Sequence, residues 1–250
     1  MPISVKSERE IELMRESGRI LAKVLEELES IIKPGISTMD VDRRCHEIIK
    51  SYDCIPSFLD YNGFPASLCI SVNDVVVHGI PNKKHILREG DIVGLDCGVI
   101  YKGYHSDAAR TVPVGEITKE AKKLIEVTRQ SFYEGIRLAK EGNHLHEISE
   151  AIQSYVESFG FSVVRDLVGH GIGKDLHEEP QIPNFKQRNR GPRLKAGMTL
   201  AIEPMVNEGR YDVFCMDDNW TVVTEDGTLS SHYENTILIT SGEPEILTKL

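Results

Sequence analysis

Apolar residues in the first part of the chain recur at alternating steps of three and four, the spacing of one face of a helix. The stripe consists of Ile11, Met14, Gly18, Leu21, Leu25, Leu28 and Ile32. It follows a capping-box pattern, SERE, at residues 7–10 and stops at Lys33-Pro34-Gly35, because proline cannot continue a helix. We expect a helix of about six turns and a second helix that begins near Ser37 or Thr38.

The stretch Val93–Val112 predicts a β-hairpin around which the rest of the chain is arranged. Two extended runs rich in β-branched and aromatic residues meet at Lys102-Gly103, where glycine supplies the positive φ that a two-residue turn requires. This turn sets Tyr101 opposite Tyr104. The preceding segment, Tyr61–Pro81, is strand-like and interrupted by glycine and proline.

The predicted register places two carboxylates on one face of the hairpin. Gly98 lies opposite Asp107 and shares a face with Asp96, so the two acids are diagonal neighbours roughly 7–8 Å apart at Cα. Burying two unpaired carboxylates would cost several kcal/mol unless a cation neutralises them, which indicates a metal. The alternative is a solvated polar edge, and a bulge would also break the face assignment.

The second half of the chain repeats the order of elements in the first. Helices are predicted at about 118–139 and 143–159, followed again by strands and by an irregular segment, Pro180–Pro192. LREGDIVGLD (87–96) aligns without a gap on LKAGMTLAIE (194–203), and this favours a duplicated helix-helix-sheet unit over chance similarity.

We therefore expect an α+β fold with one domain, residues 1–250. Its pseudo-repeats, about 7–115 and 118–250, would be related by a pseudo-twofold axis around a shared antiparallel sheet.

Three residues of the second half are further candidate metal ligands beside Asp96 and Asp107. Glu203 lies in the strand-like run MTLAIEPMV and matches Asp96 in the repeat; Glu234 lies in SSHYENTILIT, on the following extended segment, as Asp107 does in the first half. His170 stands between glycines in GHGIG, with nothing to crowd its imidazole. Four carboxylates around one divalent ion would leave excess negative charge, whereas two ions would balance them. Two such ions about 3.5–4 Å apart activate water and polarise a carbonyl, which is hydrolysis chemistry.

Composition narrows the function classes. With 29 basic and 39 acidic residues the net charge is −10, which argues against a broad nucleic-acid footprint or an anionic membrane surface. No apolar run has the length of a membrane span, and MPISVKSERE lacks the apolar core of a signal peptide. The five cysteines show no CxxC spacing, which indicates neither a disulfide framework nor a zinc site, so we expect a cytoplasmic protein. Its oligomeric state is expected to be a monomer by default.

The five candidate ligands, with VVHGIP around His78, GHGIG around His170 and HEEP at His177, resemble the type I methionine aminopeptidases of the bacterial form over essentially the whole chain. This resemblance implies the pita-bread fold and a dinuclear metal centre. It also implies removal of the initiator methionine from nascent polypeptides, at the ribosome, when the second residue is small.

The resemblance assigns a role to each ligand. Asp96 would chelate one metal, Asp107 and Glu234 would bridge both, and His170 and Glu203 would complete the shell of the other ion. Glu203 would also handle the proton of the attacking water. Co, Mn, Fe and Zn all suit such mixed ligands, so the metal stays open.

The resemblance further assigns substrate contacts. His177 would stabilise the carbonyl oxygen and His78 would contact the scissile amide. The methionine pocket would consist of Phe58, Tyr61, Phe64, Cys69, Leu176 and Trp220, and a monovalent cation would bind near Asn73, Val75 and Ser230.

Two rival functions share this fold. A prolidase or aminopeptidase acting on X-Pro bonds uses the same ligands but usually carries an additional N-terminal domain, for which we expect no room before Ser7. A non-catalytic binding module typically loses metal ligands, whereas all five candidates are present.

Overall fold

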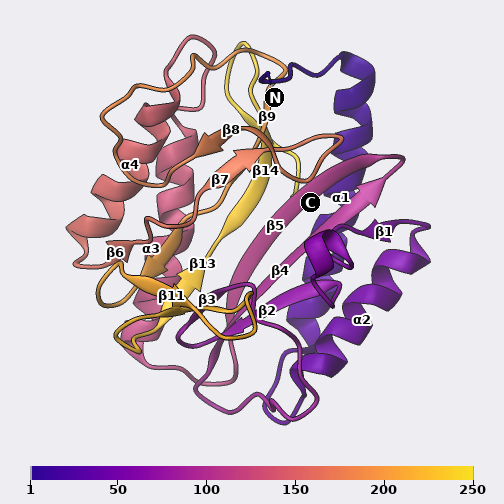
Figure 1. Ribbon diagram of the computed structural model, residues 1–250, viewed down its shortest axis with the longest axis vertical. Helices are drawn as coiled ribbons and strands as arrows, with labels where there is room; N and C mark the ends of the chain where they lie inside the picture. Colours follow the sequence, from indigo (N-terminus) through magenta and orange to yellow (C-terminus); the bar gives the residue numbers. More distant parts are fainter. Residues whose placement is uncertain (1, 250) are drawn as a thin grey trace.

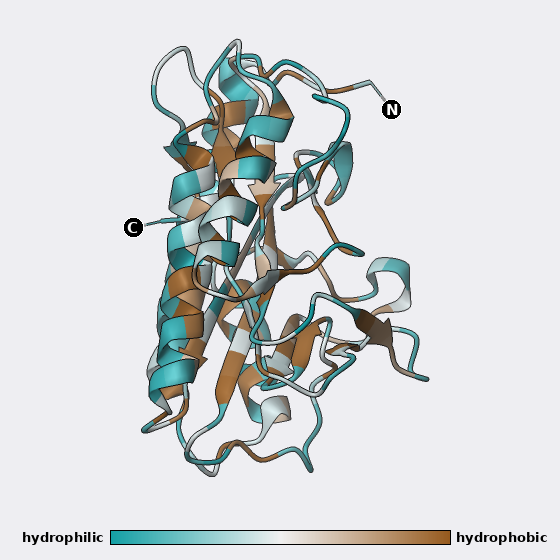
Figure 2. Ribbon diagram, turned by 90° about the vertical axis from the view of Figure 1, so that its left-hand side faces the viewer, coloured by the Kyte–Doolittle hydropathy of each residue, from teal (hydrophilic) through white to brown (hydrophobic). Residues whose placement is uncertain are grey.

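The computed structural model describes residues 2–249, in which a layer of helices covers one face of a large antiparallel β-sheet (Figures 1 and 2). The helices are α1 (Glu8–Ile31), α2 (Thr38–Ser51), α3 (Lys119–Ile136) and α4 (Leu145–Ser158), with a short 3-10 turn, η1 (Tyr61–Gly63). In Figure 1, α1 and α2 lie on one side of the view and α3 and α4 on the other. An α+β fold is therefore confirmed.

The main sheet has the strand order β1-β4-β5-β14-β9-β7-β8, and β2 pairs with β4 and β15 with β14. Its strands are β1 (Ile55–Pro56), β2 (Leu68–Val72), β4 (Ile92–Tyr101), β5 (Tyr104–Pro113), β7 (Gly169–Gly171), β8 (Glu178–Ile182), β9 (Thr199–Ile202), β14 (Glu234–Leu238) and β15 (Glu245–Ile246). Two three-stranded sheets accompany it, ordered β13-β10-β6 and β11-β12-β3. They comprise β3 (Val75–Val77), β6 (Ser162–Val163), β10 (Met205–Asn207), β11 (Val213–Cys215), β12 (Val222–Thr224) and β13 (Ser230–His232).

Capping residues begin the helices where the sequence predicts. The backbone N–H of Ser7 donates to Glu10 Oε2 over 2.9 Å, which stabilises the first turn of α1. Ser37 Oγ accepts the N–H of Asp40 at α2, and Thr118 Oγ1 accepts the N–H of Ala121 at α3. Both predicted helices of the first half are confirmed, and α2 buries Val41, Cys45, Ile48 and Ile49 as its sequence pattern requires.

The predicted hairpin register is confirmed along its whole length. Tyr101 pairs with Tyr104, Gly98 with Asp107 and Asp96 with Ala109, without a bulge. One face of the hairpin packs beneath α1 and α2 in a core that includes Val93, Leu95, Cys97 and Val99. The other face is left free to form a site.

Three sequence-based expectations about extended segments need correction. Tyr61–Gly63 forms a 3-10 turn, so the strands of that region are limited to β2 and β3. The irregular segment starts later than Pro180, because β8 continues to Ile182. The run MTLAIEPMV is divided into β9 and β10, which belong to different sheets, because Pro204 offers no N–H for a continuous ladder.

A glycine in α1 allows the C-terminal segment to pack against this helix. A Cβ built at Gly18 would lie 2.3 Å from the carbonyl oxygen of Leu247. We expect Gly18→Ala to destabilise the protein by about 1–2 kcal/mol, because overpacking exceeds the gain in helix propensity.

Thermal unfolding of Gly18→Ala tests this contact. The matched control, Glu26→Ala, lies in the same helix at an exposed position and should leave Tm nearly unchanged. A Gly18→Ala variant as stable as the wild type would contradict the packing described.

Candidate metal centre

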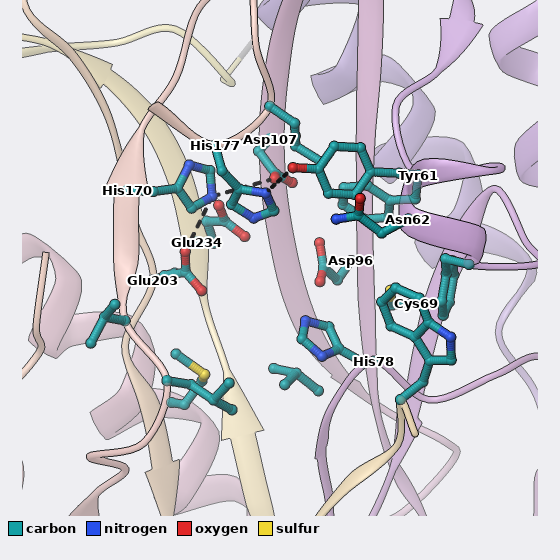
Figure 3. A pocket seen from close by; sticks show the side chains of 18 residues that line it. Tyr61, Asn62, Cys69, His78, Asp96, Asp107, His170, His177, Glu203 and Glu234 are labelled. Atoms are coloured by element: carbon teal, nitrogen blue, oxygen red, sulfur yellow. Dashed lines mark hydrogen bonds and ion pairs between the residues drawn. The ribbon is translucent and has the colours of Figure 1, made fainter. Parts of the chain in front are cut away.

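Three neighbouring strands bring acidic residues into one row across the sheet. Ala109 of β5 pairs with Asp96 of β4 on one side and with Glu234 of β14 on the other. Side chains in register share a face, and Asp107 lies two residues from Ala109 on the same face of β5. Because Ala109 is small, it leaves space between these acids, and Figure 3 shows Asp96, Asp107 and Glu234 around one cavity.

The second half of the chain adds His170 and Glu203 to this cluster of side chains. His170 pairs with Ala201 in the β7–β9 ladder, and Glu203 directly follows β9, beside the start of β14. Nε2 of His170 lies 3.5 Å from Glu203 Oε1 and 3.9 Å from Asp107 Oδ2. Nδ1 of His170 hydrogen-bonds to the carbonyl of Gly171 over 2.9 Å, so Nε2 is free to act as a ligand.

Burial and mutual repulsion disfavour the charged forms of these carboxyls. Burial raises the pKa of Asp96 to about 7. Burial, followed by neighbouring acids, raises the pKa values of Asp107, Glu203 and Glu234 well above their usual range. Burial lowers the pKa of His170 to about 3, so its imidazole is neutral. The imidazole of His170 therefore supplies no positive charge to neutralise this cluster of acids.

The donor atoms fit divalent metal ions. Buried oxygens of Asp96, Asp107 and Glu234 have no hydrogen-bond partner among the described residues, although such oxygens are normally paired. Ligand atoms of Asp107, His170 and Glu234 lie within 4.8 Å of one another, and a second such group consists of Asp96, His232 and Glu234. Carboxylate oxygen and neutral imidazole suit Mn, Fe, Co and Zn.

Both predicted substrate histidines face the same cavity (Figure 3). Nδ1 of His177 lies 2.7 Å from the hydroxyl of Tyr61, and the rings of His177 and His170 are 4.3 Å apart. His78 has a φ of 59°, a left-handed conformation that a histidine rarely adopts, and burial lowers its pKa to about 4. The strained backbone directs this ring toward the site.

The cavity measures about 230 Å³ and joins the acids to an apolar compartment. All six predicted pocket residues line it: Phe58, Tyr61, Phe64, Cys69, Leu176 and Trp220. The rings of Phe64 and Trp220 pack edge to face with their centroids 5.1 Å apart, and this contact holds one wall of the cavity in place.

The residues proposed for a monovalent cation also lie close together. The N–H of Ser230 donates to the carbonyl of Asn73 over 2.8 Å, and β3, which begins at Val75, packs beside β13, which begins at Ser230. The side chain of Asn73 is already engaged, because it donates to Asp91 and accepts from the N–H of Ile92. A cation there would rely on main-chain oxygens.

The sequence analysis did not select every residue of the site. Asn62, Val77, Leu167, Val168 and Met205 also line the cavity; as single apolar or amide residues in loops and strands they carry no distinct sequence signal. His232 was missed as well. It ends β13 and Glu234 begins β14, strands of two different sheets, so its spacing of two residues from Glu234 did not by itself place it at the site.

Comparisons with known proteins agree with this architecture. The model of metallopeptidase family M24 matches residues 12–241. The methionine aminopeptidase of Clostridium acetobutylicum is 55% identical over 246 residues, which cover 98% of each chain. The structure of methionine aminopeptidase from Thermotoga maritima has a TM-score of 0.97 at 46% identity and covers 99% of this chain and 100% of that one.

A structure from the X-Pro peptidases is less similar. The Xaa-Pro dipeptidase of Bacillus anthracis has a TM-score of 0.80 at 25% identity, and the match covers 98% of this chain but 62% of that one. The architecture common to these enzymes is the pita-bread fold, which this chain adopts. Since the family model spans most of the chain and the relatives align nearly from end to end, the protein belongs to metallopeptidase family M24 and, within it, to the methionine aminopeptidases of the bacterial type.

Proposed function

We propose that this protein removes the N-terminal methionine from nascent polypeptides whose second residue is small, by metal-dependent hydrolysis of the first peptide bond. One observation carries the proposal: the five candidate ligands converge at one end of a cavity whose remaining walls are largely apolar and aromatic. A hydrolytic centre beside an apolar side-chain pocket suits an exopeptidase specific for an apolar residue.

In this proposal Asp96, Asp107 and Glu234 would hold one divalent ion, and Asp107, Glu234, His170 and Glu203 would hold the other. The buried oxygens of Asp96, Asp107 and Glu234 that lack a partner among the described residues, and the neutral imidazole of His170, support the assignment. Two bound divalent ions would acidify a water molecule and polarise the carbonyl under attack.

The protein's own residues would position the reactants and move the proton. Glu203, which lines the cavity beside the other acids, would accept a proton from the attacking water. The hydroxyl of Tyr61 lies 2.7 Å from Nδ1 of His177. In the proposed tautomer this hydroxyl donates to Nδ1, and Nε2 carries the N–H that donates to the substrate carbonyl oxygen. His78 contacts the scissile amide from the far side of the cavity.

The pocket would select methionine by shape and polarisability. An unbranched thioether fits between aromatic walls such as Phe64 and Trp220, next to the buried thiol of Cys69. Leu176 and Phe58 would complete the apolar wall of this pocket.

X-Pro hydrolysis is the second candidate because the Bacillus anthracis dipeptidase has the same fold. The closer match to methionine aminopeptidases over nearly the full length of both chains favours the first candidate.

We further propose that the substrates are met at the ribosome, that the protein is a cytoplasmic monomer, and that a monovalent cation binds near Asn73, Val75 and Ser230. The net charge of −10 argues against extensive nucleic-acid contact of its own. Among residues 2–249, no helix has the length and apolar character needed to cross a membrane.

Peptide hydrolysis tests the proposed activity. After chelation, adding back a divalent metal should restore release of methionine from Met-Ala peptides, with much slower release from Met-Lys peptides. Equal rates on both peptides, or activity indifferent to the chelator, would contradict the proposal, and preferential turnover of X-Pro peptides would favour the second candidate.

Replacing Tyr61 tests the orientation of His177. Tyr61→Phe removes the hydroxyl that pairs with Nδ1, and the loss of about 1 kcal/mol should lower kcat roughly fivefold. The acid limb of the pH profile should also move to higher pH, because the hydroxyl favours the neutral ring.

Tyr155→Phe, on α4 outside the cavity, is the matched control and should keep wild-type kinetics. A Tyr61→Phe enzyme with an unchanged kcat and pH profile would exclude this role for the hydroxyl.

The buried acids predict how the stability of the metal-free protein depends on pH. The raised pKa values of Asp107, Glu203 and Glu234 mean that the folded state keeps protons which the unfolded chain has released, so stability falls as pH rises. Asp96, with a pKa near 7, adds to this loss mainly below pH 7. His170, with a pKa near 3, opposes this loss of stability only below about pH 6.5, where the unfolded histidine binds a proton that the folded one does not.

Between pH 6.5 and 8.5 the Tm of the metal-free protein should therefore decrease by about 5 °C or more. Metal-loaded protein should not show this decrease, and Asp107→Asn without metal should show a smaller one. A metal-free Tm that stays level or rises over this range would refute the electrostatic account.

A further inference from the structure

His232 is a buried histidine that belongs to none of the roles assigned above. It is the last residue of β13, pairs with Met205 of β10 and is 3% exposed. Thr111 fixes its backbone on both sides, because Oγ1 accepts the N–H of His232 and donates to its carbonyl, each over 2.9 Å. The position of this imidazole is therefore set by the sheet.

The free nitrogen of His232 faces the acids of the metal centre. Nε2 has no hydrogen-bond partner among the described residues and lies 3.7 Å from Glu234 Oε2 and 4.0 Å from Glu203 Oε2. These distances are too long for hydrogen bonds. The separation of 3.7 Å from Glu234 matches two donors that share one ion, because metal–ligand distances of about 2.0–2.2 Å place the donors roughly 3–4 Å apart.

His232 also makes the donor sets of the two candidate positions equivalent. Asp107, His170 and Glu234 form one compact group, and Asp96, His232 and Glu234 form the other, with Glu234 common to both. Each group contains two carboxylates and one imidazole. Without His232, the ion at Asp96 would have carboxylates as its only protein ligands.

We propose that His232 is a sixth protein ligand of the metal centre and binds the ion that Asp96 holds. This inference rests on the proposed dinuclear centre. The ligand atoms of His232, Asp96 and Glu234 lie within 4.8 Å of one another, close enough to share this ion. An added nitrogen ligand favours Fe, Co or Zn at this position over metals that prefer oxygen alone.

Metal binding and X-ray absorption test the inference without reference to activity. Calorimetry with Zn²⁺ should detect two ions in the wild type, and His232→Gln should keep one tight ion while the other binds at least about tenfold more weakly. The absorption spectrum of the zinc-loaded wild type should fit an average of one imidazole per ion, and that of the variant half as many. His85→Gln, at an exposed histidine outside the site, should match the wild type in both measurements.

The spectrum of the wild type keeps the test decisive even if His232→Gln fails to fold. An average of half an imidazole per ion in the wild-type protein would overturn the assignment of His232 and leave the five-ligand centre intact. Two equally tight ions in a folded His232→Gln variant would have the same consequence. A wild type that binds fewer than two ions would overturn both the dinuclear centre and the sixth ligand.

Discussion

Four buried carboxylates that face one another are the constraint on which the rest of this structure depends. Desolvation raises the pKa values of all four, and repulsion from neighbouring acids raises those of Asp107, Glu203 and Glu234 further; several of the oxygens have no hydrogen-bond partner among residues 2–249. A cluster of this kind is stable as a set of anions only when cations neutralise it. The fold must therefore hold these side chains in place in spite of their repulsion.

A rigid antiparallel sheet meets this requirement. Asp96, Ala109 and Glu234 form one row across three strands, and hydrogen bonds of the ladders fix the spacing of their backbones. Small residues leave space for the acids and for the metal ions that they would bind. At Gly98, opposite Asp107, a Cβ would lie only 2.7 Å from that of Ser57. Helix α1 supports the hairpin from the other face and thereby supports the site.

Local sequence determined the elements whose partners lie close along the chain. The capping box at Ser7, the stripe of α1 and the turn at Lys102-Gly103 each depend on neighbours within a few residues, so their effect can be deduced without the fold. The same reasoning correctly placed Asp96 and Asp107 on one face. The aligned repeat and the GHGIG motif supplied Glu203, Glu234 and His170, and the family resemblance supplied the candidates for substrate contact and for the monovalent cation. The internal duplication stays a prediction.

Tertiary structure alone decided how the two halves of the chain meet. The pairing of Glu234 with Ala109 joins residues more than a hundred positions apart, and no local pattern specifies that register. The end of β9 just before Glu203, and the approach of His232 to the acids, likewise result from strands belonging to different sheets. Sequence thus determined which side chains could bind metal, whereas long-range strand pairing determined which of them share a site, because register is set by partners that the local chain does not contain.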